Sequence, residues 1–228
     1  MSGKLFGIGV GPGDPELLTL KAVKTIQKCD VIAVPVSGEG ERAAFTVIEQ
    51  YLGKKELIEC SFVMEKDIVK RREARRIASD RIIRYLESGK DVGFVTLGDP
   101  TTYSTYMYMH EIIVNKGFDA QIIPGVTSYA AAAAALGVAL CEDNETLTII
   151  PAAHNEDATG LYEYPGSKVI MKPGDNLIRV LATLKERGYG DRTRIACRVT
   201  MDGQRLFASI EEYEKSPETG YFTIIIVK

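Results

Sequence analysis

The sequence predicts an α/β protein built from two domains. Its 228 residues are enough to bury a sizeable core, either in one large domain or in two small ones. Apolar runs typical of buried strands alternate with helical periodicity from Leu5 to Pro124, which indicates a mostly parallel sheet with helices on both faces. After the segment PGVTS the pattern changes to an alanine-rich helix and further strands, so we expect a second α/β domain.

The first domain is expected to alternate strands and helices along its whole length. Helices are predicted at residues 17–28, 43–51, 67–88 and 105–114, where apolar residues recur at helical spacing. Gly89 comes directly after one of them and Gly117 three residues after another, as is common where a helix ends. Short apolar or β-branched runs between the helices predict strands at LFGIG, VIAVPV, ELIEC, DVGFVTL and AQIIP.

The second domain is expected to begin with a helix that contains the alanines of residues 130–135, a composition that lets a neighbouring backbone approach closely. One further clear helix is predicted at NLIRVLATLKER. Strands are predicted at TLTII, KVIM, RIACRVT and YFTIIIV. Because Pro and Gly interrupt the pattern near Pro124, we expect the domains to span residues 1–124 and 125–228.

Charge and hydropathy exclude several classes of protein. A formal net charge of −3 argues against a general affinity for nucleic acid, which depends on Lys and Arg neutralising phosphates. No apolar run reaches the roughly 18 residues of a membrane span, and the first residues lack a charged segment followed by an apolar one. We therefore expect a cytoplasmic protein with neither a nucleic-acid nor a membrane partner.

The cysteines and histidines do not predict a metal site or a disulfide framework. Cys29, Cys60, Cys141 and Cys197 are scattered without any CxxC pair, so we expect reduced thiols in the core. His110 and His154 have no cysteine nearby, and we predict no metal ion bound by the protein itself. His110 is expected to pack within a helix, whereas His154 could contact a substrate or simply lie in a loop.

The stretch GIGVGPGD, Gly7 to Asp14, follows the first predicted strand and resembles a dinucleotide-binding loop only in part. The fingerprint GxGxxG fails, because Pro12 or Asp14 stands where the third glycine is needed. Pro12 lacks an amide donor, and the carboxylate of Asp14 would lie near a bound phosphate. The loop therefore favours a ligand without phosphate. The alternative is a glycine-rich turn that only starts a helix.

Two more loops follow predicted strands, at the edge where open α/β sheets bind their ligands. In TLGDPTTY, residues 96–103, Gly98 permits close backbone approach, and Asp99 could accept a hydrogen bond, steer a cation or open a turn. In IPGVTS, residues 123–128, Thr127 and Ser128 could cap the alanine-rich helix as well as contact a ligand.

Taken together, these loops resemble the tetrapyrrole methylase family, whose S-adenosylmethionine (SAM) dependent members act in sirohaem and cobalamin synthesis. The resemblance spans nearly the entire chain, because the family's motifs occur in order as GPGDPELLTLKA, TLGDPTTYST, PGVTSYAAAAA, VIMKPG and YFTIIIV. Within the family, TLGDPTTYSTY and YFTIIIV most resemble the branch that methylates carbon 20 of precorrin-2 or cobalt-factor II.

The resemblance implies two α/β domains with SAM in the cleft between them, a tetrapyrrole substrate and a homodimer. It also implies that the first loop lines this cleft, with Gly11 and Asp14 toward the substrate. The chain departs from the family at Cys197, which precedes Arg198 where relatives often carry an acidic residue. The SAM contacts that the resemblance implies are Pro12, Leu97, Gly98, Asp99, Thr102, Thr127, Ser128, Met171 and Val199.

Methyl transfer from a sulfonium to a ring carbon requires alignment of donor and acceptor and the loss of a proton. Asp99 is the candidate catalytic residue, because its carboxylate could hold the sulfonium or assist proton loss. Tyr103 and Tyr106, three residues apart on a predicted helix, could flank a flat substrate ring or pack in the core. The substrate's carboxylates could bind a cationic helix face, with a solvated face as the alternative, through Arg71, Arg72, Arg75, Arg76 and Arg81.

Three other functions are weighed against C20 methylation. Two are enzymatic: methylation at another ring carbon, and methylation of a diphthamide precursor on a protein, as by diphthine synthase. The third is a nucleotide-binding regulatory module without catalysis, against which the lack of any Lys or Arg between Gly7 and Leu18 counts.

Overall fold

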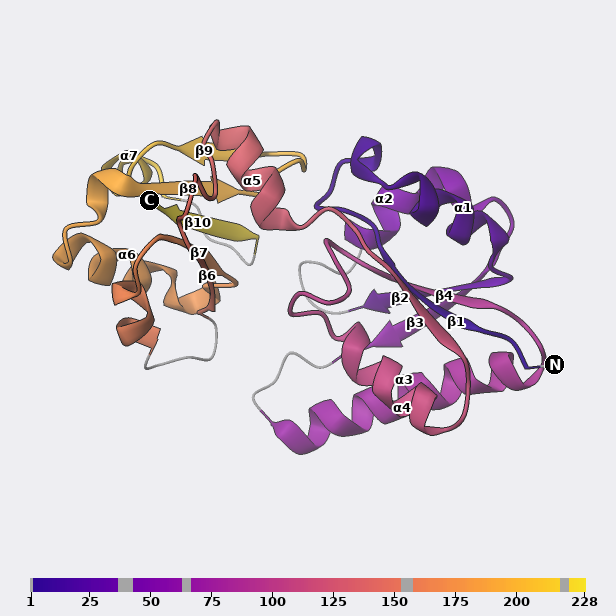
Figure 1. Ribbon diagram of the computed structural model, residues 1–228. Helices are drawn as coiled ribbons and strands as arrows, with labels where there is room; N and C mark the ends of the chain where they lie inside the picture. Colours follow the sequence, from indigo (N-terminus) through magenta and orange to yellow (C-terminus); the bar gives the residue numbers. More distant parts are fainter. Residues whose placement is uncertain (1, 37–42, 63–66, 153–157, 218–221) are drawn as a thin grey trace. The chain divides into compact units, whose positions relative to one another are not determined.

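The computed structural model describes residues 2–36, 43–62, 67–152, 158–217 and 222–228. The chain divides into two compact units, Met1–Thr127 and Ser128–Lys228, called unit 1 and unit 2 below (Figure 1). The break lies a few residues after the boundary predicted at Pro124. Both units combine a five-stranded sheet with helices, so the predicted α/β class is confirmed.

Unit 1 contains a parallel sheet with the strand order β3-β2-β4-β1-β5. Every neighbouring pair runs in the same direction, as the alternating sequence predicts. The central strands β1 and β4 are buried over their whole length, which explains their continuous apolar character. The strands are β1 (Leu5–Gly9), β2 (Val31–Val36), β3 (Glu56–Ser61), β4 (Val92–Thr96) and β5 (Ala120–Ile123).

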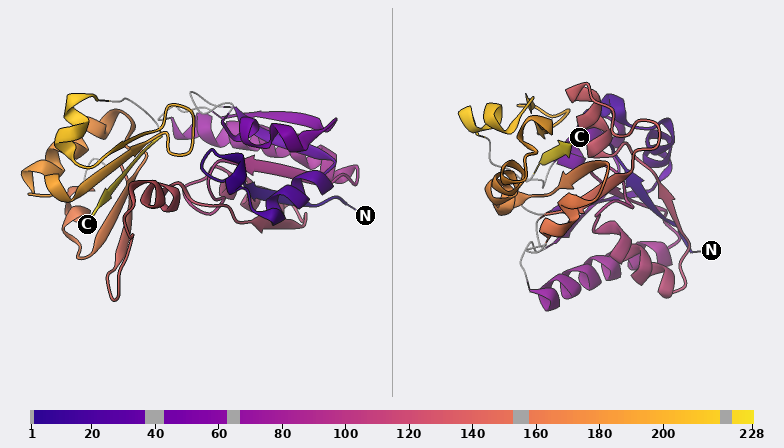
Figure 2. Two further views of the ribbon diagram at one scale, coloured as in Figure 1. Left: turned by 90° about the horizontal axis from the view of Figure 1, so that it is seen from above. Right: turned by 60° about the vertical axis from the view of Figure 1, so that its left-hand side comes forward.

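Helices cover both faces of this sheet. The pair α1 (Leu20–Lys28) and α2 (Ala43–Leu52) lies on one face, and α3 (Ile68–Glu87) and α4 (Tyr106–Asn115) lie on the other (Figures 1 and 2). Each pair buries an apolar stripe against the strands, with Ile26 and Ile48 in one cluster and Ile82, Leu86 and Met109 in the other. None of the described helices is long and apolar enough to cross a membrane.

The first helix starts later than predicted because a local cap sets its first turn, whereas the start of α4 is within one residue of the prediction. Helix α1 begins at Leu20 rather than at residue 17, since the Thr19 hydroxyl accepts a hydrogen bond from the Ala22 amide at 3.1 Å. A short 3₁₀ turn, Pro15–Leu17, precedes it and is capped by Asp14, whose Oδ1 accepts from the Glu16 amide at 2.8 Å. Helix α4 begins only at Tyr106, so Tyr103 lies outside it.

Unit 2 has a mixed sheet with the order β6-β7-β10-β8-β9. Strand β10 runs antiparallel to both of its neighbours, so β7 and β8 point the same way and their carboxyl ends lie at one edge. The short β9, in sequence without marked alternation, is not predicted. The strands are β6 (Leu147–Pro151), β7 (Ser167–Met171), β8 (Thr193–Cys197), β9 (Arg205–Phe207) and β10 (Thr223–Val227).

The helices of unit 2 pack against two separate apolar clusters. The alanines of α5 (Ser128–Leu136) lie in one cluster, and α6 (Leu177–Glu186) contributes Leu181 and Leu184 to the other. Helix α7 (Ile210–Lys215) also joins the second cluster, through Tyr213, and it is absent from the prediction. Short 3₁₀ helices occur at Ala158–Glu163, Gly174–Asn176 and Gly190–Arg192.

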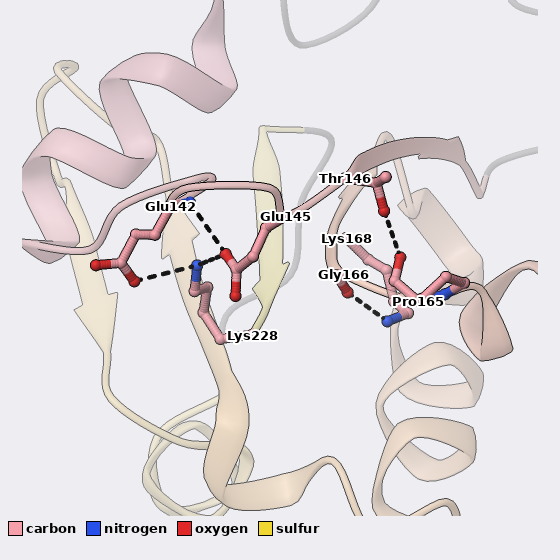
Figure 3. A network of polar contacts seen from close by, with 7 residues as sticks. All are labelled: Glu142, Glu145, Thr146, Pro165, Gly166, Lys168 and Lys228. Carbon is pink, nitrogen blue, oxygen red and sulfur yellow. Dashed lines mark hydrogen bonds and ion pairs between the residues drawn. The ribbon is translucent and has the colours of Figure 1, made fainter.

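Lys228 holds the segment that links α5 to β6. Figure 3 shows its ammonium group between two carboxylates, 2.6 Å from Glu145 and 3.8 Å from Glu142. The Glu142 amide also donates to Glu145, at 3.2 Å, which folds this segment back on itself. Beside it, the Thr146 hydroxyl donates to the Pro165 carbonyl at 2.7 Å and joins the start of β6 to the turn before β7.

The cysteines match the prediction at three of four positions. All four are free thiols, and Cys29, Cys60 and Cys197 are buried. Cys141 is exposed, so the prediction of a core thiol is wrong there. It follows Leu140, which packs against an apolar cluster, and it begins the exposed run of residues 141–146.

Candidate functional site

Three loops meet at the carboxyl edge of the unit 1 sheet. They follow β4, β1 and β5, which are neighbouring parallel strands, so their ends lie side by side. The first two loops are joined directly by an isolated antiparallel bridge between Gly11 and Gly98. Its two N···O distances are 2.6 and 3.3 Å. Segments predicted separately as ligand loops therefore form one structural element.

Glycines allow these backbones to touch. A Cβ atom added to Gly9 would lie 2.6 Å from the Gly125 nitrogen and 2.7 Å from the Gly98 carbonyl oxygen. One added to Gly125 would lie 2.2 Å from the same Gly98 oxygen. All three separations are shorter than real Cβ contacts, so no side chain fits at either position. The close approach that the glycine-rich sequence indicates is, at Gly9, an approach of backbone to backbone within the protein.

Asp99 connects the second loop to the third. Its Oδ1 accepts from the Thr101 amide at 2.8 Å and from the Thr101 hydroxyl, and its Oδ2 accepts from the Gly125 amide at 3.0 Å. The residue is only 7% exposed. Buried carboxylates need such partners. Asp99 is thus placed among protein donors, which is the geometry of a residue that holds loops in register.

The other residues predicted on these loops lie at the same edge with differing exposure. Gly11, Pro12 and Gly98 are buried, and Gly11 and Gly98 have positive φ values of 77° and 74°. The carboxylate of Asp14 is half-buried and caps the following 3₁₀ turn. The side chains that remain half-buried are Leu97, Thr102, Thr127 and Ser128.

The structure separates the two predicted tyrosines. Tyr106 is fully buried: its ring fills the space above Gly7 and packs against Phe94 at a centroid distance of 5.7 Å, and its hydroxyl lies 3.0 Å from His110 Nδ1. The prediction that Tyr106 contacts substrate is therefore corrected to a core role, and burial raises the pKa of its phenol. Tyr103 is 43% exposed and precedes the helix, with a φ of 52°.

Three residues that organise the loops were missed by the sequence reasoning. Thr101 and Gly125 supply the donors to Asp99, and Ser104 Oγ lies 2.9 Å from the Thr96 hydroxyl. The Asp-Pro-Thr sequence at Asp99 is the available signal, because Asp side chains often accept from the amide two residues on. The partnership with Gly125 has no such signal, since it joins distant parts of the chain.

Met171 and Val199, the two predicted SAM contacts beyond the three loops, lie in unit 2. Both are largely buried, and they lie at the ends of β7 and β8, at the same edge of the unit 2 sheet. Each adjoins a residue with an unusual backbone. Lys172 follows Met171 with a φ of 53°, while Arg198 and Thr200 flank Val199 with φ values of 51° and 62°.

The arginines of α3 are largely engaged within the protein. Arg76 forms ion pairs with Glu73 at 2.6 Å and Asp80 at 2.8 Å, and Arg81 donates to the Glu59 carbonyl at 2.6 Å. Arg75 stacks on the Tyr108 ring at 3.6 Å. This arrangement favours the solvated helix face over a set of carboxylate-binding side chains.

The structure describes one of the two histidines, His110, and it belongs to no candidate metal site among the described residues. His110 packs within α4 beside Tyr106, as predicted. His154 lies outside the described residues. Among the residues that the structure describes, no group of three His, Cys, Asp or Glu side chains could hold a metal ion.

A groove of about 430 Å³ lies on unit 1 at α1, away from the three loops. It is lined by Phe6, Leu20, Lys21, Lys24, Thr25 and Lys28. Helix α1 follows β1 and runs back along the sheet, so its last residues, with Lys24 and Lys28, lie near the amino ends of the strands. The groove therefore lies toward that edge of the sheet. Open α/β sheets bind ligands at the other edge.

Known proteins were compared with the chain as a whole. The family model for tetrapyrrole (corrin/porphyrin) methylases matches residues 4–214. The chain belongs to this family. The resemblance read from its motifs is therefore confirmed, and a nucleotide-binding module is not favoured.

Two relatives and one solved structure illustrate the match. A protein of Methanocaldococcus jannaschii named probable cobalt-precorrin-2 C(20)-methyltransferase is 32% identical, over 99% of this chain and 96% of its own. A Sinorhizobium precorrin-2 C(20)-methyltransferase is 30% identical, over 99% and 95%. A Thermus thermophilus uroporphyrin-III C-methyltransferase complexed with S-adenosyl homocysteine shares the fold, with a TM-score of 0.75, 21% identity and coverage of 99% and 97%.

Proposed function

We propose that the chain transfers a methyl group from SAM to carbon 20 of precorrin-2, or of its cobalt complex, in cobalamin biosynthesis. The observation that carries the proposal is the full-length similarity to relatives named for this reaction, at 32% and 30% identity. One of these names specifies cobalt and the other does not, so the metal content of the substrate is left to experiment. The proposal includes a cytoplasmic homodimer, which rests on the resemblance and the composition.

The donor set of the three loops suits SAM. Residues 7–18, 96–104 and 123–128 contain no Lys, Arg or His. They offer backbone groups, hydroxyls and apolar surface, which fit an uncharged adenosine better than a phosphate. When bound, SAM supplies the methyl group from its sulfonium and leaves as the neutral thioether, while the acceptor carbon loses a proton. We propose that Leu97, Gly98, Thr102, Thr127 and Ser128 contact SAM from unit 1, with Pro12 in the first loop and Met171 and Val199 in unit 2.

The protein's own part in this reaction is alignment. Asp99 accepts from Thr101 and Gly125, so we assign it the positioning of the second and third loops rather than proton abstraction. Gly11 supports the bridge to the second loop, and Asp14 caps the turn beyond it. Tyr103, exposed beside the second loop, is the remaining candidate for stacking on the flat substrate.

The test is methylation of defined pigments. The purified protein is incubated without oxygen with SAM carrying an isotopically labelled methyl group and with either precorrin-2 or cobalt-precorrin-2, and products are analysed by mass spectrometry and NMR. One labelled methyl at carbon 20 is expected. The faster pigment identifies the natural substrate. Gly190→Ala serves as a matched active variant, because a Cβ there meets no atom within 4 Å.

Other outcomes point to the remaining alternatives. A methyl at a different ring carbon would assign the chain to another branch of the family. If S-adenosylhomocysteine binds but no pigment is methylated, the acceptor is wrong, and a diphthamide precursor becomes the next candidate. Size measurement in solution tests the homodimer separately.

A further inference from the structure

Left-handed backbone in residues other than glycine marks the strand-end edge of unit 2. Such conformations are unfavourable for residues with a Cβ, and they tend to persist at functional sites. Of these residues in the described chain, Tyr103 lies in the loop after β4 in unit 1, and Asp143 lies in the loop before β6. The others all follow β7 or β8: Lys172, Arg198 and Thr200.

Arg198 is held by contacts that fix its direction. Its amide donates to the Phe222 carbonyl at 2.9 Å, and its Nε donates to the Asp202 carbonyl at 2.8 Å. The side chain passes over Gly203, where an added Cβ would lie 3.6 Å from Nε. The guanidinium group is therefore anchored by one nitrogen on a turn of the backbone.

The terminal nitrogens of Arg198 remain available to a ligand. The residue is exposed, and among the residues that the structure describes no carboxylate lies within ion-pair distance of its guanidinium. A planar guanidinium with two parallel donors is the side chain best matched to a carboxylate. Glycine would adopt this backbone conformation without strain. The presence of Arg198 at this strained position therefore indicates that its side chain has a function.

We propose that Arg198 binds a peripheral carboxylate of the tetrapyrrole substrate. This inference rests on the proposed function, and it assigns Arg198 to the pigment rather than to the carboxylate of SAM. Its neighbour Val199 is buried at the same strand end, so a carboxylate held by Arg198 lies beside a predicted SAM contact. Arg198 is thus a substrate-binding residue that determines specificity for polycarboxylate pigments.

The test compares Arg198→Gln with Arg194→Gln and Arg198→Lys. Arg194 is a matched control on the same strand, because its guanidinium donates to the Asp191 carbonyl at 2.7 Å at the opposite end of β8. For each variant, thermal unfolding checks the fold, calorimetry gives the Kd for S-adenosylhomocysteine, and steady-state assays give KM for the pigment. Binding of uroporphyrin III, a stable tetrapyrrole polycarboxylate, and of its fully esterified form is measured by fluorescence quenching.

For Arg198→Gln we expect a rise of at least about tenfold in the pigment KM and in the Kd for uroporphyrin, on the order of one charged hydrogen bond. The Kd for S-adenosylhomocysteine should stay within about twofold, and the ester should bind equally to wild type and variant. For Arg198→Lys, the pigment KM and the uroporphyrin Kd should lie between those of wild type and Arg198→Gln, since lysine keeps the charge without the planar pair of donors.

Several results would overturn the assignment. These are an unchanged uroporphyrin Kd in a folded Arg198→Gln variant, a loss confined to S-adenosylhomocysteine, or no uroporphyrin binding by wild type. The proposed function fails differently: neither pigment is methylated by wild type. In that case the uroporphyrin comparison still decides the role of Arg198, because it requires no turnover.

Discussion

The two strand-end edges of the molecule meet a similar demand on the backbone in different ways. At the carboxyl ends of β1 and β4 in unit 1, the left-handed positions closest to the strands are the glycines Gly11 and Gly98, and Tyr103 is left-handed farther along the second loop. At the ends of β7 and β8 in unit 2, left-handed positions are taken by Lys172, Arg198 and Thr200. Glycine releases the strain but removes the side chain.

The difference follows from what lies against each edge. In unit 1 the loops pack on one another, and a Cβ on Gly9 or Gly125 would strike another loop's backbone. In unit 2 the left-handed residues are exposed or half-buried, and two of them carry long cationic side chains. Unit 1 therefore uses its strand ends to build a rigid element, whereas unit 2 uses them to display side chains.

The largest effect is expected from Gly125→Ala. The new Cβ would lie 2.2 Å from the Gly98 carbonyl oxygen, so the second and third loops must separate. Overpacking of this kind costs about 3 kcal/mol of unfolding free energy, and we expect methyl transfer to fall at least about a hundredfold. Urea unfolding and turnover measure both.

Gly190→Ala is the control for that experiment and should change neither quantity, because nothing lies within 4 Å of its added Cβ. If Gly125→Ala retained wild-type stability and turnover, the interlocked loops would not be the rigid element that the comparison requires.

Asp99 tests the same element through its hydrogen bonds. Asp99→Ala leaves the amides of Thr101 and Gly125 without their acceptor, which should cost about 2 kcal/mol of stability. Asp99→Asn keeps one acceptor oxygen and should lose less. A positioning role predicts that turnover and stability fall together across the two variants, with an unchanged pH profile of kcat. A catalytic base predicts instead that Asn abolishes turnover in a stable protein.

Much of unit 1 could be predicted from sequence because its signals are local. Its buried strands are continuous apolar runs, and Asp67 caps α3 where the helix is predicted to begin. The short elements of unit 2 were harder. Helix α7 has about one and a half turns, and its only sequence signal is Ser209 followed three residues later by Glu212. The Ser209 hydroxyl accepts a hydrogen bond from the Glu212 amide at 3.1 Å.

The candidate site was predictable in its loops and less so in its contacts. The motifs that identify the family contain Gly98, Asp99 and Thr127. The contact of Gly9 with Gly125 depends on how the sheet orders β1 beside β5, which no local pattern encodes. Tyr106 was misassigned because its ring turns into the core against Phe94, and the spacing of the tyrosines does not show which face of the helix is buried.

Thr200→Gly tests the left-handed backbone at the strand ends of unit 2. A β-branched residue with a φ of 62° is strained, so glycine should raise the unfolding free energy by about 1 kcal/mol. The gain is reduced by glycine's greater freedom in the unfolded chain. Urea unfolding measures it, with Ala208→Gly, an exposed residue without positive φ, as the destabilised control. A destabilised Thr200→Gly would show that side-chain contacts outweigh the strain.

The smallest expected effect concerns reactivity rather than stability. Burial raises the pKa of the Cys29 and Cys60 thiols in unit 1 to about 12, so neither is a thiolate near neutral pH. Cys141 in unit 2 is exposed. At about pH 8 a thiol reagent should modify one cysteine per folded chain, and Cys141→Ser should abolish that reaction. Because the unfolded thiols ionise at lower pH than the folded ones, stability should also decline as pH rises above about 9. Rapid labelling of Cys29 or Cys60 in the folded protein would mean that the unit 1 core opens readily, against the rigidity inferred for its strand-end loops.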